Sequence, residues 1–574
     1  MHLPTIFRTL LVAIVLFGLS CSPPPAPWDG PKLTQPRDQL RVEQLQEDSL
    51  PAYLDMSYYA KPDWATAATH AFSGVISFAA KAINHPQERA PYEGENVFPA
   101  TELAFISHEG ELIPLQKDII RTADTVGSLW DVIVGTGKIW QEPEDGEWSR
   151  ASFPLTLTER YMGQTRNCVA TFVYQSETIS NICVQCSQET ADINDRQVGD
   201  IQVVLPAKYK PEIFVDSAEV IAQHLEYQAR KLPVLPLSTV DAEGELSAIF
   251  TERIYTSAST SIGAILMDDK IYFDPPQTRH GTYPYPDDLR CGVYSVTKSL
   301  AGSLALFYLA ERYGEDILDA KITDYVPALA DHPGWQGVTF AHTLNMAPGT
   351  VGSEEAHHLL HILVLSRTAE ESINNIATLG DAPAAPGEYF NYASTNFFVL
   401  SYAMQQYVVA QEGPGVSYWD LVREEVLEPI GAEHFSLRYS VENDSTQGIP
   451  ILGYGARPTL DEAAKISRLL INDGKHEGRQ LLHLQTVRDA LGKTAWPGYD
   501  TRNDFRGTKY RHSFWSKPVR TADCTVTASY MLGFGANLVV FLPSDVVIFR
   551  FMDEFDLDID RMVQSVEKIK SSCD

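Results

Sequence analysis

One short motif fixes the local geometry of this chain more firmly than any other. Ser295 and Lys298 stand three positions apart, at the start of a run that predicts a helix ending near Gly314. Side chains at this spacing share one face of a helix, so the serine hydroxyl and the lysine amine are expected within hydrogen-bond reach. A desolvated lysine loses its proton more readily and can then accept the proton of a serine. The motif therefore predicts a nucleophile and its base on one helical turn.

The N-terminus predicts export. Residues 9–19 form an apolar run that is too short to span a bilayer comfortably, which is typical of a signal peptide over residues 1–20. The Cys21 that follows resembles a bacterial lipoprotein processing site, so we expect lipidation of Cys21 and a periplasmic or outer-membrane location. Gly18 stands where such signals usually carry leucine. Ordinary secretion with a free or disulfide-bonded Cys21 therefore remains the alternative.

The charge of the chain limits its partners. With 75 acidic and 45 basic residues among 574, the formal net charge is −30. Such a surface repels nucleic acid and anionic lipid headgroups, so a lipid chain on Cys21 is the one membrane link that we predict. A small-molecule substrate is expected, and the sequence predicts no particular protein partner. The length favours two or three domains.

Changes of pattern divide the chain. Residues 21–45 are rich in proline at their start and predict an extended tether, and residues 46–235 carry short alternating apolar runs that predict a β-rich domain, either a sandwich or a curled sheet. Residues 236–574 begin with a predicted hairpin, continue with helices and close with three strands and a helix over about 557–570. This order predicts an α+β fold, with a second sheet built from both ends of the domain.

The cysteines and histidines allow several interpretations. Six cysteines besides Cys21 are compatible with disulfides in an exported protein, but the sequence does not give their pairing. Cys291 is a candidate partner of Cys524, and buried free thiols are the alternative. A cluster around His357 and His361 resembles metal ligands at helical spacing, but we interpret it as a solvated helix near the cleft and predict no metal and no cofactor.

Several motifs in a fixed order carry a family resemblance. After Ser295-x-x-Lys298 come a loop-and-helix segment at 331–349, a Tyr392-Ala-Ser394 triplet within 386–396, and Gly-Phe-Gly-Ala-Asn at 533–537. In this order, residues from about 245 to 574 resemble the penicillin-recognising serine hydrolases. This family includes class C β-lactamases, D-alanyl-D-alanine carboxypeptidases and related esterases, so the resemblance implies a β-lactamase-like catalytic domain, with an antiparallel sheet, flanking helices and a helical subdomain.

The resemblance also implies roles for individual residues. Ser295 is expected to attack the acyl carbon, Lys298 to act as general base, and Tyr392 to relay a proton to the leaving group. The N–H groups of Ser295 and Asn537 are expected to bind the oxyanion. Three further residues are expected to contact substrate: Ser394, Phe534 and Gly535.

Two departures from the family pattern point to the substrate. Ser394 stands where the family has asparagine, and Phe534 stands where it usually has a lysine or histidine. Without that cation the site has no evident partner for a substrate carboxylate. We therefore expect a hydrolase that acts on uncharged esters or amides. The alternatives are a D-Ala-D-Ala carboxypeptidase or β-lactamase with a substitute cation from the 502–520 region, and an inactive binding module of the same fold.

Overall fold

The computed structural model describes residues 30–573 with internal gaps. The segments left out are 48–51, 84–93, 123–126, 161–162, 191–199, 252–259, 351–353, 355–358, 360–365, 367, 381–382, 443–447, 502–506 and 553–556. The expected signal peptide, Cys21, His357 and His361 lie outside the described residues. Within the part of the chain that the structure describes, no helix is both long and apolar enough to cross a membrane.

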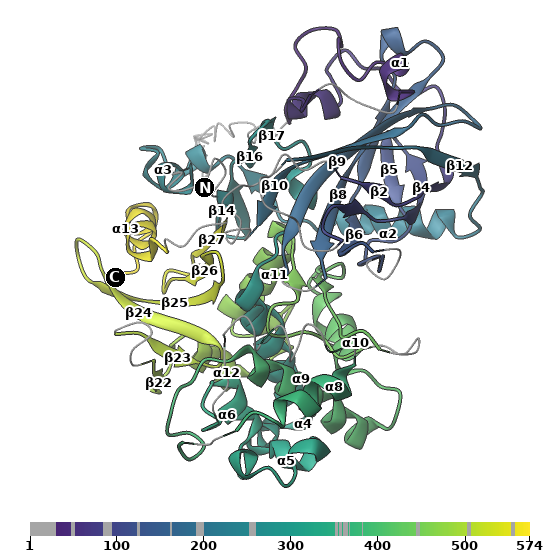
Figure 1. Cartoon of the computed structure of the whole chain (residues 1–574). Helices are drawn as coiled ribbons and strands as arrows, with labels where there is room; N and C mark the ends of the chain where they lie inside the picture. The colour runs from purple at the N-terminus through teal and green to yellow at the C-terminus, as the bar shows by residue number, and fades with distance from the viewer. Residues whose placement is uncertain are drawn as a thin grey trace, which may run out of the picture.

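A ten-stranded antiparallel sheet forms the first half of the molecule, in the order β11-β10-β9-β8-β7-β5-β4-β1-β12, with β6 paired to β8 (Figure 1). Its two longest strands are buried along their whole length, which explains their nearly continuous apolar and small-residue sequences. This sheet confirms the β-rich prediction. The strands are β1 (Ser73–Phe78), β4 (Thr101–His108), β5 (Glu111–Pro114), β6 (Trp130–Val134), β7 (Gly137–Trp140), β8 (Ser149–Glu159), β9 (Thr165–Tyr174), β10 (Ile182–Thr190), β11 (Ile201–Leu205) and β12 (Ala207–Pro211).

The segment before this sheet is packed, which corrects the prediction of a tether as far as residue 45. Arg37 is 4% exposed and forms an ion pair with Glu142 at 2.8 Å. Leu40 and Leu45 are buried in the hydrophobic core, the latter at the end of α1 (Val42–Leu45). The proline-rich composition suggested an unpacked chain, but an ion pair to a residue 105 positions away holds this part of it.

A second sheet of nine strands has the order β13-β15-β14-β27-β26-β25-β24-β23-β22. Strands from both ends of the domain meet where β14 pairs with β27, as the sequence predicted. Helix α3 packs on β14 and helix α13 on β24, while α11 lies against β14 as well. The strands are β13 (Val234–Leu235), β14 (Thr260–Met267), β15 (Lys270–Phe273), β22 (Tyr499–Asp500), β23 (Lys509–Arg511), β24 (Phe514–Arg520), β25 (Thr525–Gly533), β26 (Asn537–Phe541) and β27 (Val547–Met552).

The helices that lie between β15 and β22 in the sequence form the end of the molecule opposite the first sheet (Figure 1). Together the two parts confirm the α+β prediction. The helices of the chain after α1 are α2 (Ser217–Ala229), α3 (Glu245–Thr251), α4 (Leu304–Tyr313), α5 (Ile322–Tyr325), α6 (Phe340–Leu344), α8 (Ala369–Ile376), α9 (Ser394–Glu412), α10 (Tyr418–Val422), α11 (Leu460–Ile471), α12 (Leu484–Ala490) and α13 (Ile559–Ile569). Short two-stranded ladders pair β2 (Lys81–Ala82) with β3 (Val97–Phe98), β16 (Gln277–Thr278) with β17 (Gly281–Thr282), β18 (Ser436–Leu437) with β19 (Ala456–Arg457), and β20 (Lys475–His476) with β21 (Arg479–Gln480).

The first sheet supports the segment that leads into the nucleophile. The Asn167 amide on β9 donates to the Arg290 carbonyl at 2.8 Å and accepts from the Arg290 N–H at 3.1 Å. Two residues further on, the Gly292 N–H donates to the Thr165 hydroxyl. The start of β9 therefore fixes the backbone a few residues before Ser295.

Two disulfides link cysteines within the described residues, Cys168 to Cys186 and Cys524 to Cys573. Cys183 and Cys291 are buried and form no disulfide with another described cysteine. The suggested pairing of Cys291 with Cys524 is therefore wrong, because the C-terminal segment after α13 brings Cys573 to Cys524 instead. Cys183 and Cys186 both lie on β10.

Candidate active site

Ser295 occupies a tight turn that leads into α4. It lies in a 3₁₀ turn, η5 (Tyr294–Val296), followed by a π-helical turn, η6 (Lys298–Ser303), and by α4. Tyr294 has φ of 45°, a left-handed conformation that costs a non-glycine residue about 1–2 kcal/mol. The predicted helix is thus irregular at its start. Within 291–300, Ser295 is the one residue that is not buried, so the strained turn presents its hydroxyl.

Lys298 contacts the nucleophile directly. Its Nζ lies 2.7 Å from Ser295 Oγ, 2.9 Å from Ser394 Oγ and 2.9 Å from the carbonyl oxygen of Gly453. Lys298 is 1% exposed, and no carboxylate among the described residues forms an ion pair with it. Burial lowers its pKa from the usual 10.5 to about 8, against a smaller opposing effect of Glu354. A substantial fraction of the amine is therefore neutral near physiological pH and can act as a base.

The hydrogen bonds around the amine favour a lone pair directed at Ser295. The Gly453 carbonyl can only accept, so it must receive one N–H of Lys298. The Ser394 hydroxyl donates to Glu354 Oε2 at 3.2 Å, which leaves its oxygen free to accept the second N–H. A neutral amine has no further N–H, so its lone pair remains for the proton of Ser295. Ser394 can take the place of the asparagine in the family pattern, because Lys298 needs only a correctly oriented hydrogen-bond acceptor at this position.

Tyr392 completes the group of reactive side chains. The Lys298 Nζ lies 4.8 Å from the centre of its ring. Burial raises the pKa of Tyr392, and a hydrogen bond between the Tyr392 and Ser295 hydroxyls offsets part of this rise. The phenol is therefore neutral and is a proton donor. Its ring is held by Trp515, with a 5.6 Å centroid separation, and by Tyr510 at 6.3 Å.

The segment before Tyr392 is fixed by the 331–349 motif that the sequence singled out. The Asn391 N–H donates to the Met346 carbonyl at 2.7 Å, and the Ala393 N–H to Met346 Sδ at 3.4 Å. Met346 follows α6 and has φ of 55°. Its backbone and sulfur thus hold Tyr392 from both sides.

The strand residue beside the nucleophile is Gly533, at the end of β25. A Cβ at this position would lie 2.2 Å from the Val293 carbonyl oxygen and 3.2 Å from the Ser295 nitrogen, so only glycine permits the approach. Asn537, the predicted oxyanion residue, lies across the hairpin on β26, paired with Gly533. Its side chain donates to the Phe534 carbonyl and accepts from the Met552 N–H. These contacts use the side chain of Asn537 to build the hairpin, and the expected role of its backbone N–H as an oxyanion donor stays a prediction.

The surroundings of the site supply little positive charge. Phe534 is 40% exposed and its ring lies 5.5 Å from that of Tyr294, while Gly535 follows it in the β25–β26 turn with φ of 77°. Strand alternation puts Met531, which is buried, on the same face of β25 as Gly533. Neither Met531 nor Phe534 carries a cation. At this end of β25 the strand offers a substrate only apolar side chains and backbone.

An arginine near the site does not replace the missing cation. Arg511 follows Tyr510 on β23, so their side chains leave opposite faces of the strand. Tyr510 contacts Tyr392, whereas the Arg511 guanidinium donates to the Trp496 carbonyl and to Ser516 Oγ at 2.7 Å.

The structure adds three groups that sequence reasoning did not assign to the site: the Gly453 carbonyl, the Gly533 backbone and the Glu354 carboxylate. Glu354 accepts from both the N–H and the hydroxyl of Ser394. It stood out in the sequence only as a member of the His-rich cluster. No group of three or more metal-ligating side chains is found among the residues that the structure describes.

Comparisons with known proteins show which family and which structures the chain is similar to. Residues 264–539 match the family model named Beta-lactamase. No curated protein matches the chain. Among solved structures, a penicillin-binding protein homologue from Caulobacter crescentus is 13% identical with a TM-score of 0.43, and the match covers 59% of this chain and 98% of that one.

Two further solved structures match a similar share of the chain. A penicillin-binding protein from Bacillus halodurans is 15% identical with a TM-score of 0.41, over 58% of this chain and 98% of its own. A D-stereospecific amidohydrolase from Streptomyces sp. is 13% identical with a TM-score of 0.39, over 57% and 97%.

Proposed function

We propose that this protein hydrolyses uncharged esters or amides through an acyl-enzyme on Ser295, a proposal supported by the match of residues 264–539 to the family model named Beta-lactamase. The observation that carries the proposal is the 2.7 Å contact between Ser295 Oγ and the buried Lys298 amine, whose pKa burial lowers to about 8. This contact supplies the one chemical requirement that a serine alone lacks, a base in place at neutral pH.

Acylation begins with transfer of the Ser295 proton to Lys298 as Oγ attacks the substrate carbonyl carbon. The resulting oxyanion needs N–H donors. The Ser295 N–H is one, and we assign the second to Phe534, the residue after Gly533, because Gly533 brings the end of β25 against the Ser295 nitrogen. Each such donor is worth about 10²–10³ in turnover.

Collapse of the tetrahedral intermediate breaks the bond to the leaving group, which must take up a proton. Tyr392 is a neutral phenol bonded to Ser295, and Lys298 lies over its ring, so the phenol can give its proton to the leaving group and recover one from Lys298. In the second half of the cycle water attacks the acyl carbon. The same groups then act in reverse, and Ser295 is released with its proton.

The charges at the site support uncharged substrates. Met531 and Phe534 on one side offer no cation, and the Glu354 carboxylate, bonded to Ser394, repels a second carboxylate. A D-Ala terminus or a β-lactam, each bearing a carboxylate, therefore finds no partner among these residues. This favours the ester or amide interpretation over the carboxypeptidase or β-lactamase alternative.

The test is covalent labelling of the full chain. Incubation with a fluorophosphonate should add one label on Ser295, detected by mass spectrometry, whereas a penicillin should add none under the same conditions. Ser295→Ala should abolish both the label and the hydrolysis of a short-chain p-nitrophenyl ester. Ser299→Ala, which removes a hydroxyl one turn away that donates to the Ser513 carbonyl, is the matched control and should keep the label.

Two results would contradict the proposal. A fluorophosphonate label that persists in Ser295→Ala would remove Ser295 as the nucleophile. Rapid labelling by penicillin would overturn the substrate class while leaving the nucleophile in place.

A further inference from the structure

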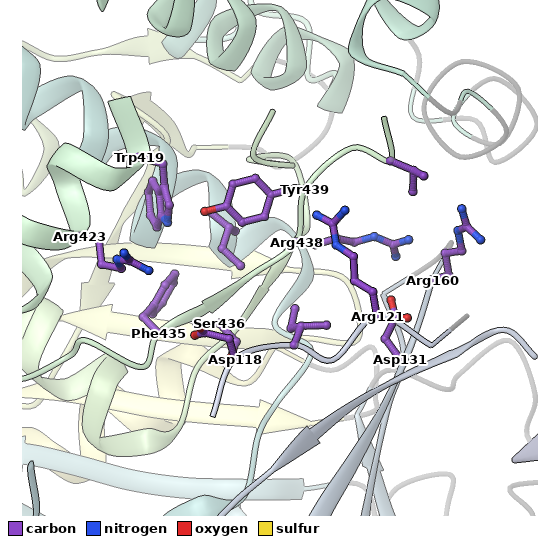
Figure 2. Close-up of a pocket in the computed structure, with 13 residues that line it drawn as sticks. Asp118, Arg121, Asp131, Arg160, Trp419, Arg423, Phe435, Ser436, Arg438 and Tyr439 are labelled. Carbon is purple, nitrogen blue, oxygen red and sulfur yellow. The ribbon is translucent and has the colours of Figure 1, made fainter. Parts of the chain in front are cut away.

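A cavity separate from the Ser295 site lies where the first sheet meets the C-terminal part of the chain. It has a volume of about 240 Å³, and Figure 2 shows residues from both halves of the molecule converging on it. Asp131 comes from β6 and Arg160 from the end of β8, whereas Trp419 comes from α10 and Arg438 follows β18. No sequence pattern indicated this cavity, because its walls are about 300 positions apart along the chain.

The cavity is positive in a protein of net charge −30. Four arginines line it, Arg121, Arg160, Arg423 and Arg438, against two aspartates. Among the described residues, none forms an ion pair or hydrogen bond with Arg121 or with the Arg423 side chain. A guanidinium does not lose its proton in a protein, so an anion is the remaining way to compensate this charge.

Arg423 carries the clearest sign of a missing partner. Its Nε is shielded from solvent and has no hydrogen-bond partner within the described part of the chain. A buried donor without an acceptor is destabilising and rare in folded proteins. Arg423 lies in the π-helical turn η11 (Arg423–Leu427), directly after α10, so it is held by regular structure at the wall of the cavity.

Arg438 shows the same lack of compensation at the other end. One guanidinium nitrogen donates to the Glu159 carbonyl at 3.0 Å. Burial is the main cause that lowers its pKa, Arg160 acts in the same direction, and Asp131 opposes them without prevailing. In the view of Figure 2, Arg121, Arg160 and Arg438 gather at one side of the cavity.

The opposite side carries aromatic rings, and Figure 2 shows Arg423 beside them. Trp419 and Phe435 lie 6.2 Å apart, and Tyr439 lies over the same side in Figure 2. The volume is below the roughly 300–1,000 Å³ of sites for drug-sized ligands, so the ligand must be small. Guanidinium groups suit carboxylates and phosphates, and the rings suit an aryl or apolar group.

We propose that this cavity binds a small organic acid, with its carboxylate or phosphate on the arginines and its apolar part against Trp419 and Tyr439. The site is separate from Ser295 but is linked to Lys298, the proposed base, through backbone hydrogen bonds. The Arg438 N–H donates to the Gly455 carbonyl, and the Arg438 carbonyl accepts from the Ile451 N–H. Between these two lies Gly453, whose carbonyl receives Lys298. One hydrogen-bonded segment thus joins the bound acid to the catalytic base.

The test is calorimetric titration of Ser295→Ala protein, in which no acyl-enzyme forms, so the result does not depend on the proposed hydrolysis. The probes are benzoate, phenyl phosphate and the uncharged benzyl alcohol. We expect at least one of the anions to bind at least 10-fold more tightly than benzyl alcohol. Adding Arg121→Gln and Arg423→Gln should weaken that anion at least 10-fold without changing the affinity for benzyl alcohol. The preference between benzoate and phenyl phosphate identifies the acid group.

Controls keep the proposal falsifiable. Arg488→Gln removes an arginine that pairs with Asp473 on the surface and should leave binding unchanged. Because Arg121 is exposed, Arg121→Gln alone should fold normally and still weaken the anion measurably, even if the double variant proves unstable. Equal affinities for both anions and benzyl alcohol, or an anion affinity that survives loss of the arginines, would overturn the proposal.

Discussion

Two buried cations, eight positions apart on one segment, have opposite roles. Arg290 donates to both oxygens of the fully buried Glu462, at 3.0 and 3.3 Å. Burial alone would lower its pKa, but the Glu462 carboxylate, together with Tyr227 and Asp288, outweighs burial and raises the pKa. Lys298 is buried equally well, but its hydrogen-bond partners are neutral, and its pKa falls to about 8.

The difference shows that the charge of the partner, rather than burial, separates a structural cation from a reactive one. A buried cation with a carboxylate stays charged and holds elements together, here the 290 segment and the start of α11. A buried lysine among hydroxyls and carbonyls is instead poised to lose its proton. Variants that change one side of this comparison should affect either stability or catalysis.

The largest effect is expected from Lys298→Met. Removing the base should lower kcat/KM for a p-nitrophenyl ester by about 10²–10⁴-fold. Below pH 8, Lys298 is charged in both the folded and the unfolded state, but only the folded state removes this charge from water. This desolvation lowers the free energy of unfolding of the wild type. The free energy of unfolding of Lys298→Met should therefore equal or exceed that of the wild type at pH 7, as measured by thermal melting. A strongly destabilised variant would show that Lys298 is structural like Arg290.

The opposite result is expected from Glu462→Gln, which removes the charge beside Arg290. A glutamine can still accept the Thr459 N–H at the start of α11, so the substitution leaves the helix cap in place. The unpaired Arg290 should lower the free energy of unfolding by about 3–5 kcal/mol, measured by urea denaturation. The pH dependence of kcat/KM in the folded protein should not change. Asp473→Asn, at a surface pair, is the control and should have little effect.

The pH dependence of activity should report Lys298 directly. Because the base must be unprotonated, kcat/KM should fall below pH 8 by about tenfold per pH unit, reaching about 100-fold below its plateau at pH 6. The stability of the protein should rise with pH from about 8 towards 10.5, where the unfolded chain holds a proton on this lysine and the folded chain does not. A flat rate profile between pH 6 and 9 would exclude Lys298 as the base.

The sequence predicted the part of the site that is local. Ser295 and Lys298 are one turn apart, so their contact follows from spacing alone, and the resemblance to a family added Tyr392 and Ser394. The Gly453 carbonyl is 155 positions from Lys298 and carries no side-chain signal. It could not have been found without the tertiary structure.

The missed contact of Gly533 and the incorrect tether prediction have physical causes of the same kind. Gly533 and Asn537 are cross-strand neighbours in a hairpin, and a five-residue run does not show which of them faces Ser295. The tether prediction judged residues 30–45 by composition, but the Arg37 pair with Glu142 depends on a segment far away in sequence. In each case the deciding contact joins segments that only the fold brings together.

The smallest expected effect sharpens the comparison within the active site itself. Glu354 raises the pKa of Lys298 against the larger effect of burial, so it gives this lysine a weak form of what Glu462 gives Arg290. Glu354→Gln removes that charge but retains an acceptor for the Ser394 hydroxyl. The pKa of Lys298 should therefore fall further, and the acid limb of the kcat/KM profile should move to lower pH. Glu388→Gln should leave the limb in place, because among the residues that the structure describes the Glu388 carboxylate accepts only the Ala385 N–H. If the acid limb of the kcat/KM profile instead moved to higher pH in Glu354→Gln, Glu354 would be lowering the pKa of Lys298. The carboxylate would then act by orienting Ser394 rather than through its charge.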